Sequence, residues 1–132
     1  MDPRFNLCME LPLEELDFQL SPSLTAKDTD ASLTALSEGT DQAKNSASLT
    51  VHPDVRYGNR PRQILDVFTS TSRTGPPRPC LLFIHGGFWQ EGSKEFSGFA
   101  AQAFVDHDWS YVSVGYTLTP DVSLSELAHE IS

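Results

Sequence analysis

The sequence has few cysteines and few positive charges. Its 132 residues contain 2 cysteines, and 9 lysines and arginines stand against 18 aspartates and glutamates, a formal net charge of −9. Nucleic acids and anionic membranes both attract clustered basic residues, so this balance argues against either partner. The spacing of Cys8 and Cys80 indicates no disulfide framework. Cys80 lies in an apolar run, where we expect it to pack as a small hydrophobic side chain.

Long apolar segments are missing as well. No run approaches the roughly 20 apolar residues of a membrane-spanning helix, and residues 1–20 lack the continuous apolar core of a signal peptide. We therefore expect a cytoplasmic protein. Asp106, His107 and Asp108 stand together, but they fall at an expected corner between a helix and a strand, where polar residues are usual. We expect no metal site there.

The chain changes character near residue 50. Residues 1–50 are rich in Ser, Thr, Asp and Ala, and we expect a helical, partly disordered N-terminal arm. Residues 51–132 alternate between strand and helix patterns, which predicts an α/β fold with four strands and two helices. The strands are expected at residues 52–57, 63–69, 80–84 and 111–116.

The two expected helices follow the third and fourth strands. The run from Cys80 to Ile84 is apolar at every position, which is typical of a strand covered on both faces. Beyond it, Ser93 is placed to cap a helix with Glu95 in its first turn. Later, Ser123 and Glu126 form a capping box for the last helix. The apolar face of the first helix would consist of Phe96, Phe99, Ala100, Ala103 and Phe104.

The most distinctive segment is His85-Gly86-Gly87-Phe88-Trp89, directly after the third expected strand. Acyl transfer creates a negative oxygen, which a pair of backbone N–H groups can stabilise. Two glycines let bare backbone approach a substrate, so the N–H groups of Gly87 and Phe88 are the candidate donors. We expect His85 to fix the loop by hydrogen bonding, and Trp89 to pack beneath it or wall an acyl pocket. A Gly-Gly pair alone would equally fit a simple turn.

Several segments in collinear order resemble one enzyme family. They are Arg56-Tyr57-Gly58, Gln63 to Phe68, Phe83 to Trp89, Gly92-Ser93-Lys94, and Val114-Gly115-Tyr116 through Pro120. Together they resemble α/β-hydrolases of the kynurenine formamidase (arylformamidase) type, and Leu16 to Ser23 is similar to the segment before the first strand of those enzymes. Phe88 stands where Tyr is frequent, and Thr117 where a charged residue is common.

The resemblance implies hydrolysis of the formamide of N-formylkynurenine, a step of tryptophan breakdown. It implies a Ser-Asp-His triad, no metal and no cofactor, with a small acyl or formamide molecule as substrate. It assigns His85, Gly86, Gly87, Phe88 and Trp89 to the box associated with the oxyanion hole.

The nucleophile motif of this fold, Gly-x-Ser-x-Gly, is not found. No serine has glycine both two residues before and two residues after it. We therefore expect the N-terminal portion of the hydrolase, residues 51–132 being a truncated domain, with no catalytic residue in the chain and negligible activity alone. Two alternatives stay open: a general carboxylesterase of the same fold, and a non-catalytic remnant acting through protein contacts. Cys80 to Ile84 would then form an exposed apolar edge able to self-associate.

Overall fold

The computed structural model describes residues 11–72 and 75–132, so the expectation for Cys8 lies outside the described residues. The chain divides into two compact units, Met1–Ser32 and Leu33–Ser132. The first unit contains the short helices α2 (Leu13–Leu20) and α3 (Pro22–Thr25). Both fall within the predicted N-terminal arm, whose boundary near residue 50 stays a prediction. None of the described helices is both long and apolar enough to span a membrane.

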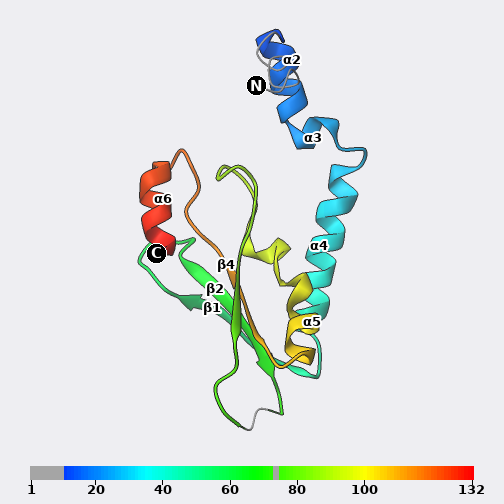
Figure 1. The fold of residues 1–132 in the computed structure, drawn as a ribbon, viewed down its shortest axis with the longest axis vertical. Helices are drawn as coiled ribbons and strands as arrows, with labels where there is room; N and C mark the ends of the chain where they lie inside the picture. Colours follow the sequence, from blue (N-terminus) through cyan, green and yellow to red (C-terminus); the bar gives the residue numbers. More distant parts are fainter. Residues whose placement is uncertain (1–10, 73–74) are drawn as a thin grey trace, which may run out of the picture. The chain divides into compact units, whose positions relative to one another are not determined.

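The second unit is built on one mixed sheet. Its strands are β1 (Leu49–Arg56), β2 (Ile64–Ser70), β3 (Cys80–Ile84) and β4 (Ser110–Val114), in the spatial order β1-β2-β4-β3 (Figure 1). The pairs β1–β2 and β2–β4 are antiparallel, whereas β3–β4 is parallel. A parallel pair needs a crossover connection, which here contains α5 (Ala101–Asp106). The predicted α/β fold with four strands is confirmed.

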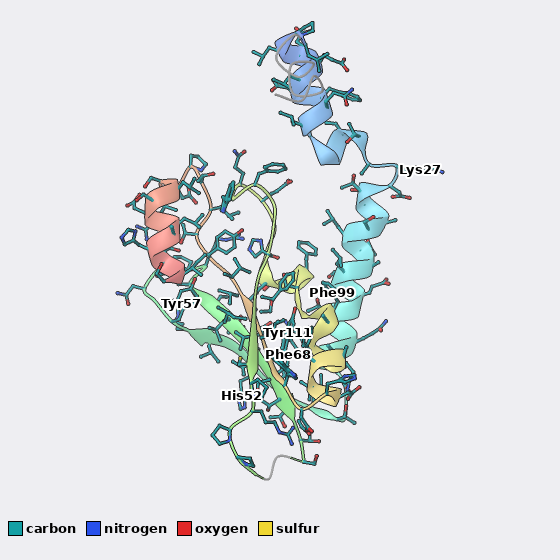
Figure 2. The ribbon with its side chains drawn as sticks, viewed as in Figure 1. Lys27, His52, Tyr57, Phe68, Phe99 and Tyr111 are labelled. Atoms are coloured by element: carbon teal, nitrogen blue, oxygen red, sulfur yellow. The ribbon has the colours of Figure 1, made fainter. Side chains whose placement is uncertain are left out.

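The main core lies between one face of the sheet and helix α5. Phe68 of β2 and Tyr111 of β4 are fully buried, with ring centroids 6.1 Å apart (Figure 2). Phe83 of β3 stacks on Tyr111 at 6.3 Å. Ala101 and Val105 of α5 close this cluster. Each aromatic side chain buries a large apolar area, so these rings hold β2, β3 and β4 together.

Strand β3 is exposed on one face, which corrects two expectations. Leu82 and Ile84 are 53% and 45% exposed, while Leu81 and Phe83 are half-buried against the core. The expectation that Cys80 packs as a small hydrophobic side chain was wrong, because Cys80 is exposed. The prediction of a strand covered on both faces was wrong as well, because the described residues cover only the face toward α5. A uniformly apolar run cannot distinguish these two situations.

The helix expected after Ser93 is broken into shorter pieces. Two 3₁₀ turns, η1 (Lys94–Phe96) and η2 (Gly98–Ala100), precede α5, and the Ser93 side chain makes no capping hydrogen bond. Tertiary contacts compete with helix formation here. The Lys94 carbonyl accepts from the Ser113 hydroxyl at 2.8 Å, and the Gly98 N–H donates to Thr40 of α4 (Thr29–Lys44) at 3.0 Å. The periodicity of Phe96 to Phe104 carries no information about these partners.

The last helix forms as expected. Helix α6 (Leu124–Ile131) begins after Ser123, whose side chain accepts from the Glu126 N–H while the Glu126 carboxylate accepts from the Ser123 N–H. The predicted capping box is confirmed. Leu127 of this helix packs with Val122 and Tyr116 in a second apolar cluster. That cluster supports the segment after β4, which lies beside the candidate site.

Candidate functional site

The loop from His85 to Ser93 leaves the carboxyl end of β3 and leads into η1. In Figure 1 it is the yellow-green loop between β3 and the short helices before α5. The carboxyl ends of parallel strands are the usual location of ligand sites in α/β sheets. We call the segment from His85 to Ser93 the anion-binding loop, after the role that we propose for it.

Three consecutive carbonyl oxygens of this loop accept hydrogen bonds from the protein. The His85 oxygen accepts from the Tyr116 hydroxyl at 2.7 Å. The Gly86 oxygen accepts from Nδ1 of His85 at 2.8 Å. The Gly87 oxygen accepts from the N–H of Glu91 at 3.0 Å, which closes a turn. Each carbonyl is thereby fixed in direction.

The engaged carbonyls determine where the following N–H groups point. In a trans peptide the N–H is directed opposite to the carbonyl of the same unit. The N–H groups of Gly86, Gly87 and Phe88 therefore face away from the protein donors. None of the three finds an acceptor within residues 11–72 and 75–132. Successive free N–H groups form an anion-binding concavity. The donors predicted at Gly87 and Phe88 are thus free, and their role in binding stays a prediction.

The loop backbone is strained at two non-glycine residues. Phe88 and Trp89 have φ values of 50° and 61°, and Gly87 has a φ of 115°. The left-handed region costs roughly 1–2 kcal/mol for each residue with a Cβ. Such outliers cluster at functional sites, where surrounding contacts hold them. Phe88 and Trp89 are 62% and 49% exposed, so Trp89 is not buried beneath the loop and its side chain is available to a ligand.

Two anchors hold the far side of the loop. The Trp89 carbonyl accepts from the N–H of Thr119 at 2.8 Å. The guanidinium of Arg62 donates to the carbonyl of Gly92 at 2.6 Å and to that of Tyr116 at 2.9 Å. Arg62 therefore connects both chain segments that meet at the loop. These contacts were missed by sequence reasoning, because a basic residue before a strand carries no signal of its backbone partners.

His85 is buried. It is 6% exposed, and its ring stacks on Tyr116 with centroids 4.2 Å apart. Burial lowers its pKa, and the positive charge of Arg62 acts in the same direction. Because a carbonyl only accepts, Nδ1 carries the proton that bonds to Gly86. Nε2 is buried without a partner among the described residues. This side chain has the geometry of a support for the loop backbone.

A buried ion cluster lies next to the loop. Asp66, at a core-facing position of β2, is fully buried and accepts from Lys94 at 2.7 Å, while Lys44 lies 2.8 Å from its other oxygen. Burial alone would raise the pKa of Asp66, but the hydrogen bonds from both lysines outweigh it and hold the pKa below its ordinary value. Sequence reasoning missed this cluster, and an acidic residue between apolar neighbours in a strand is the signal that could have revealed it.

The polar residues at the end of α5 make local contacts. His107 contacts the carbonyl of Ala103 through Nδ1 at 2.8 Å, and Asp108 pairs with Arg78 at 3.1 Å. In the part of the chain that the structure describes, no group of three or more His, Cys, Asp or Glu side chains could hold a metal ion.

Comparison with known proteins gives consistent relatives, although no family model matches. Kynurenine formamidase from Salmo salar is 37% identical over 128 residues, which is 89% of this chain and 42% of the relative. The Danio rerio enzyme of the same name is 33% identical, with 89% and 41% covered. Esterase LipC from Mycobacterium tuberculosis is 34% identical over 67 residues, or 50% of this chain and 17% of LipC.

Solved structures agree on the fold. A protein from Silicibacter sp. TM1040 with a provisional thioesterase name superposes with a TM-score of 0.77 at 23% identity, covering 89% of this chain and 44% of that one. A bacterial heroin esterase superposes with a TM-score of 0.56 at 24% identity, covering 98% and 40%. The fold is therefore that of the α/β-hydrolase esterases. In sequence, the chain is a homologue of the kynurenine formamidases and spans about two fifths of the length of the curated relatives it matches.

The two glycines of the loop should respond differently to substitution. An added Cβ at Gly87 would overlap the Glu91 carbonyl at a positive φ, whereas an added Cβ at Gly86 meets no atom within 4 Å. We expect Gly87→Ala to lower the free energy of unfolding by at least ~1 kcal/mol, and Gly86→Ala to change it by less than about 0.5 kcal/mol. Urea unfolding of both variants measures the difference. Equal effects would contradict the described turn.

Proposed function

We propose that the anion-binding loop is the oxyanion hole of a hydrolase site of the kynurenine formamidase type. The observation that carries this is the set of engaged carbonyls, which leaves the N–H groups of Gly87 and Phe88 free and directed outward. In the reaction, water cleaves the formyl C–N bond of an aryl formamide. The hydroxyl goes to formate and the proton to the amine. Removing one oxyanion donor typically slows such reactions about 10²–10³-fold.

Within the loop the residues take different roles. Gly87 and Phe88 donate to the developing oxyanion. His85 supports the loop and is no general base, since its Nδ1 is used by Gly86 and its Nε2 is buried. The exposed aromatic side chains of Phe88 and Trp89 would wall the acyl or aryl group of the substrate. Aryl formamide as substrate is supported by the relatives named kynurenine formamidase.

Ester hydrolysis is the second candidate. It is favoured by relatives whose names refer to esters, Esterase LipC and an Arabidopsis thaliana protein named as a probable isoprenylcysteine methylesterase. The same two N–H groups would serve an ester carbonyl. The two substrates differ in the leaving group, an amine from a formamide and an alcohol from an ester.

The nucleophile would have to come from outside these 132 residues. The sequence contains no Gly-x-Ser-x-Gly, and the buried Ser113 hydroxyl is used by the Lys94 carbonyl. In this proposal the chain contributes the oxyanion hole without the triad.

The exposed edge of β3 supports a further proposal, that the chain associates through it. Leu82 and Ile84 are exposed on an edge strand that carries no charge. Two copies could extend the sheet by antiparallel pairing of these edges without charge repulsion. This would be the contact surface of a non-catalytic role.

Binding of a tetrahedral anion tests the oxyanion hole directly. We expect phenylphosphonate to shift the ¹⁵N–¹H signals of Gly87 and Phe88 in a saturable way, because its oxygens accept from these donors. The amide of Gly115, which bonds to the Ile64 carbonyl at 2.9 Å, should not move. Benzyl alcohol, which is neutral, serves as the control ligand. No saturable shift at Gly87 or Phe88 would contradict the proposal.

Turnover tests the missing nucleophile. We expect the purified chain to hydrolyse neither N-formylkynurenine nor nitrophenyl acetate faster than buffer alone. The two substrates are compared because the first reports formamide and the second ester hydrolysis. Hydrolysis above the buffer rate that Gly87→Ala abolishes would show that the chain holds a nucleophile after all.

Self-association is tested at the β3 edge. We expect Leu82→Lys to weaken association in sedimentation velocity, because antiparallel pairing of two identical edges brings the lysines of both copies onto one face, where like charges repel. Leu124→Lys is the matched control, since Leu124 is similarly exposed at 51% but lies on α6. A monomeric parent chain, or equal effects of the two substitutions, would refute association through this edge.

A further inference from the structure

Lys94 is a buried lysine at the end of the loop segment. It lies two residues after Gly92, and the whole residue is 3% exposed. Its ammonium contacts three carboxylates: Asp66 at 2.7 Å, Asp54 at 3.0 Å and Glu95 at 3.1 Å. The proposed reaction uses none of these groups. Of its partners, Asp66 is fully buried, whereas the side chains of Asp54 and Glu95 are 67% and 52% exposed. The enclosed pair of Lys94 with Asp66, beside a set of free backbone donors, calls for a physical explanation.

The protein backbone is shaped to receive this cluster. A register shift between His52 and Val55 of β1 forms a bulge. Within it, Asp54 has a φ of 54°, and its N–H donates to Oδ1 of Asp66 at 3.0 Å. Bulges re-aim backbone groups next to functional sites. Here the bulge supplies Asp66 with a backbone donor in addition to the two lysines.

Stability alone does not explain a buried ion pair. Desolvation of both charges offsets most of their attraction, and apolar replacement of a whole pair is often neutral or stabilising. What a buried pair can provide is a fixed geometry, because neither charge can move without losing its partner. The relevant geometry is that of the chain segment to which Lys94 belongs.

Lys94 is attached to the sheet at two points. Its ammonium is held by Asp66 of β2, and its carbonyl accepts from Ser113 of β4 at 2.8 Å. The anion-binding loop is therefore held at both ends. It begins at β3, and it ends at the contacts of Lys94 with Asp66 and Ser113. Arg62 adds its hydrogen bond to Gly92 in between.

We propose that Lys94 is a positioning residue of the anion-binding loop, whose ion pair with Asp66 fixes the end of the loop so that the N–H groups of Gly87 and Phe88 keep their outward direction. The inference rests on the proposed function for its catalytic meaning. Its structural content, the dependence of loop order on Lys94, stands by itself.

Lys44 offers a matched control. It pairs with the other oxygen of Asp66 at 2.8 Å, but it comes from α4, and its side chain is 27% exposed. It makes no described contact with residues 85–93. Lys44→Met and Lys94→Met each remove one positive charge from the same carboxylate, and only the second frees the loop.

Amide hydrogen exchange provides the readout. The N–H groups of Glu91 and Thr119 bond to the carbonyls of Gly87 and Trp89 and so report the loop, whereas the N–H of Gly115 bonds to Ile64 and reports the sheet. We expect Lys94→Met to reduce the protection of Glu91 and Thr119 about tenfold relative to Gly115. Lys44→Met should leave this ratio unchanged.

The proposal is overturned if the loop amides keep their protection in Lys94→Met, if loop and sheet amides lose protection equally, or if Lys44→Met shows the same loss ratio. The double variant Lys94→Met/Asp66→Asn has no carboxylate at position 66. It therefore controls for unfolding caused by a buried charge that has lost its partner. We expect it to fold with the loop amides still unprotected. Full loop protection in it, or failure of both Lys94 variants to fold, would assign Lys94 a purely structural role. No substrate enters this measurement, so its failure is distinct from failure of the phosphonate titration.

Discussion

The contacts of Tyr116 with the loop are the constraint on which the candidate site depends. Its hydroxyl donates to the His85 carbonyl, its ring stacks on the His85 imidazole, and its own carbonyl accepts from Arg62. Because Tyr116 also packs against Val122 and Leu127, the position of α6 and the direction of the first loop carbonyl are linked. A displacement of Tyr116 would therefore reach the backbone donors without touching a glycine. The glycines of the loop are flexible, and the contacts of the segment after β4 restrict their backbone conformation.

Most of the fold was predicted from the periodicity of the sequence, and the errors of this prediction have a common cause. Strand positions and the capping box at Ser123 depend on local patterns, and they were predicted correctly. The exposed face of β3 and the broken helix after Ser93 depend on which neighbours are present. An apolar run is compatible with one covered face or two, and Phe96 to Phe104 has helical spacing whether or not Ser113 captures the Lys94 carbonyl. Local sequence does not encode these partners.

The sequence predicted where the candidate site lies, but it did not predict the long-range contacts that hold the loop in place. The sequence pointed to Gly87 and Phe88 through their place after a strand and their resemblance to a known box. The engaged carbonyls, the Arg62 bridge and the pair of Asp66 with Lys94 all join residues that lie far apart in the chain. Among these residues, Asp66 could have been noticed in the sequence, as an acidic residue within an apolar strand pattern. A polar residue that interrupts an apolar strand pattern is thus a clue to long-range supports.

The hydrogen bonds that anchor the loop explain how its backbone strain is maintained. Phe88 and Trp89 in the left-handed region would relax if the loop were free, since each costs roughly 1–2 kcal/mol. Hydrogen bonds from Tyr116, Glu91 and Thr119 hold the carbonyls around them, and these donors belong to the described chain itself. An oxyanion hole is effective when its donors are oriented before charge develops. The described residues therefore contain the means to orient the donors, independently of any nucleophile, and that orientation is set by the same contacts that sustain the strain.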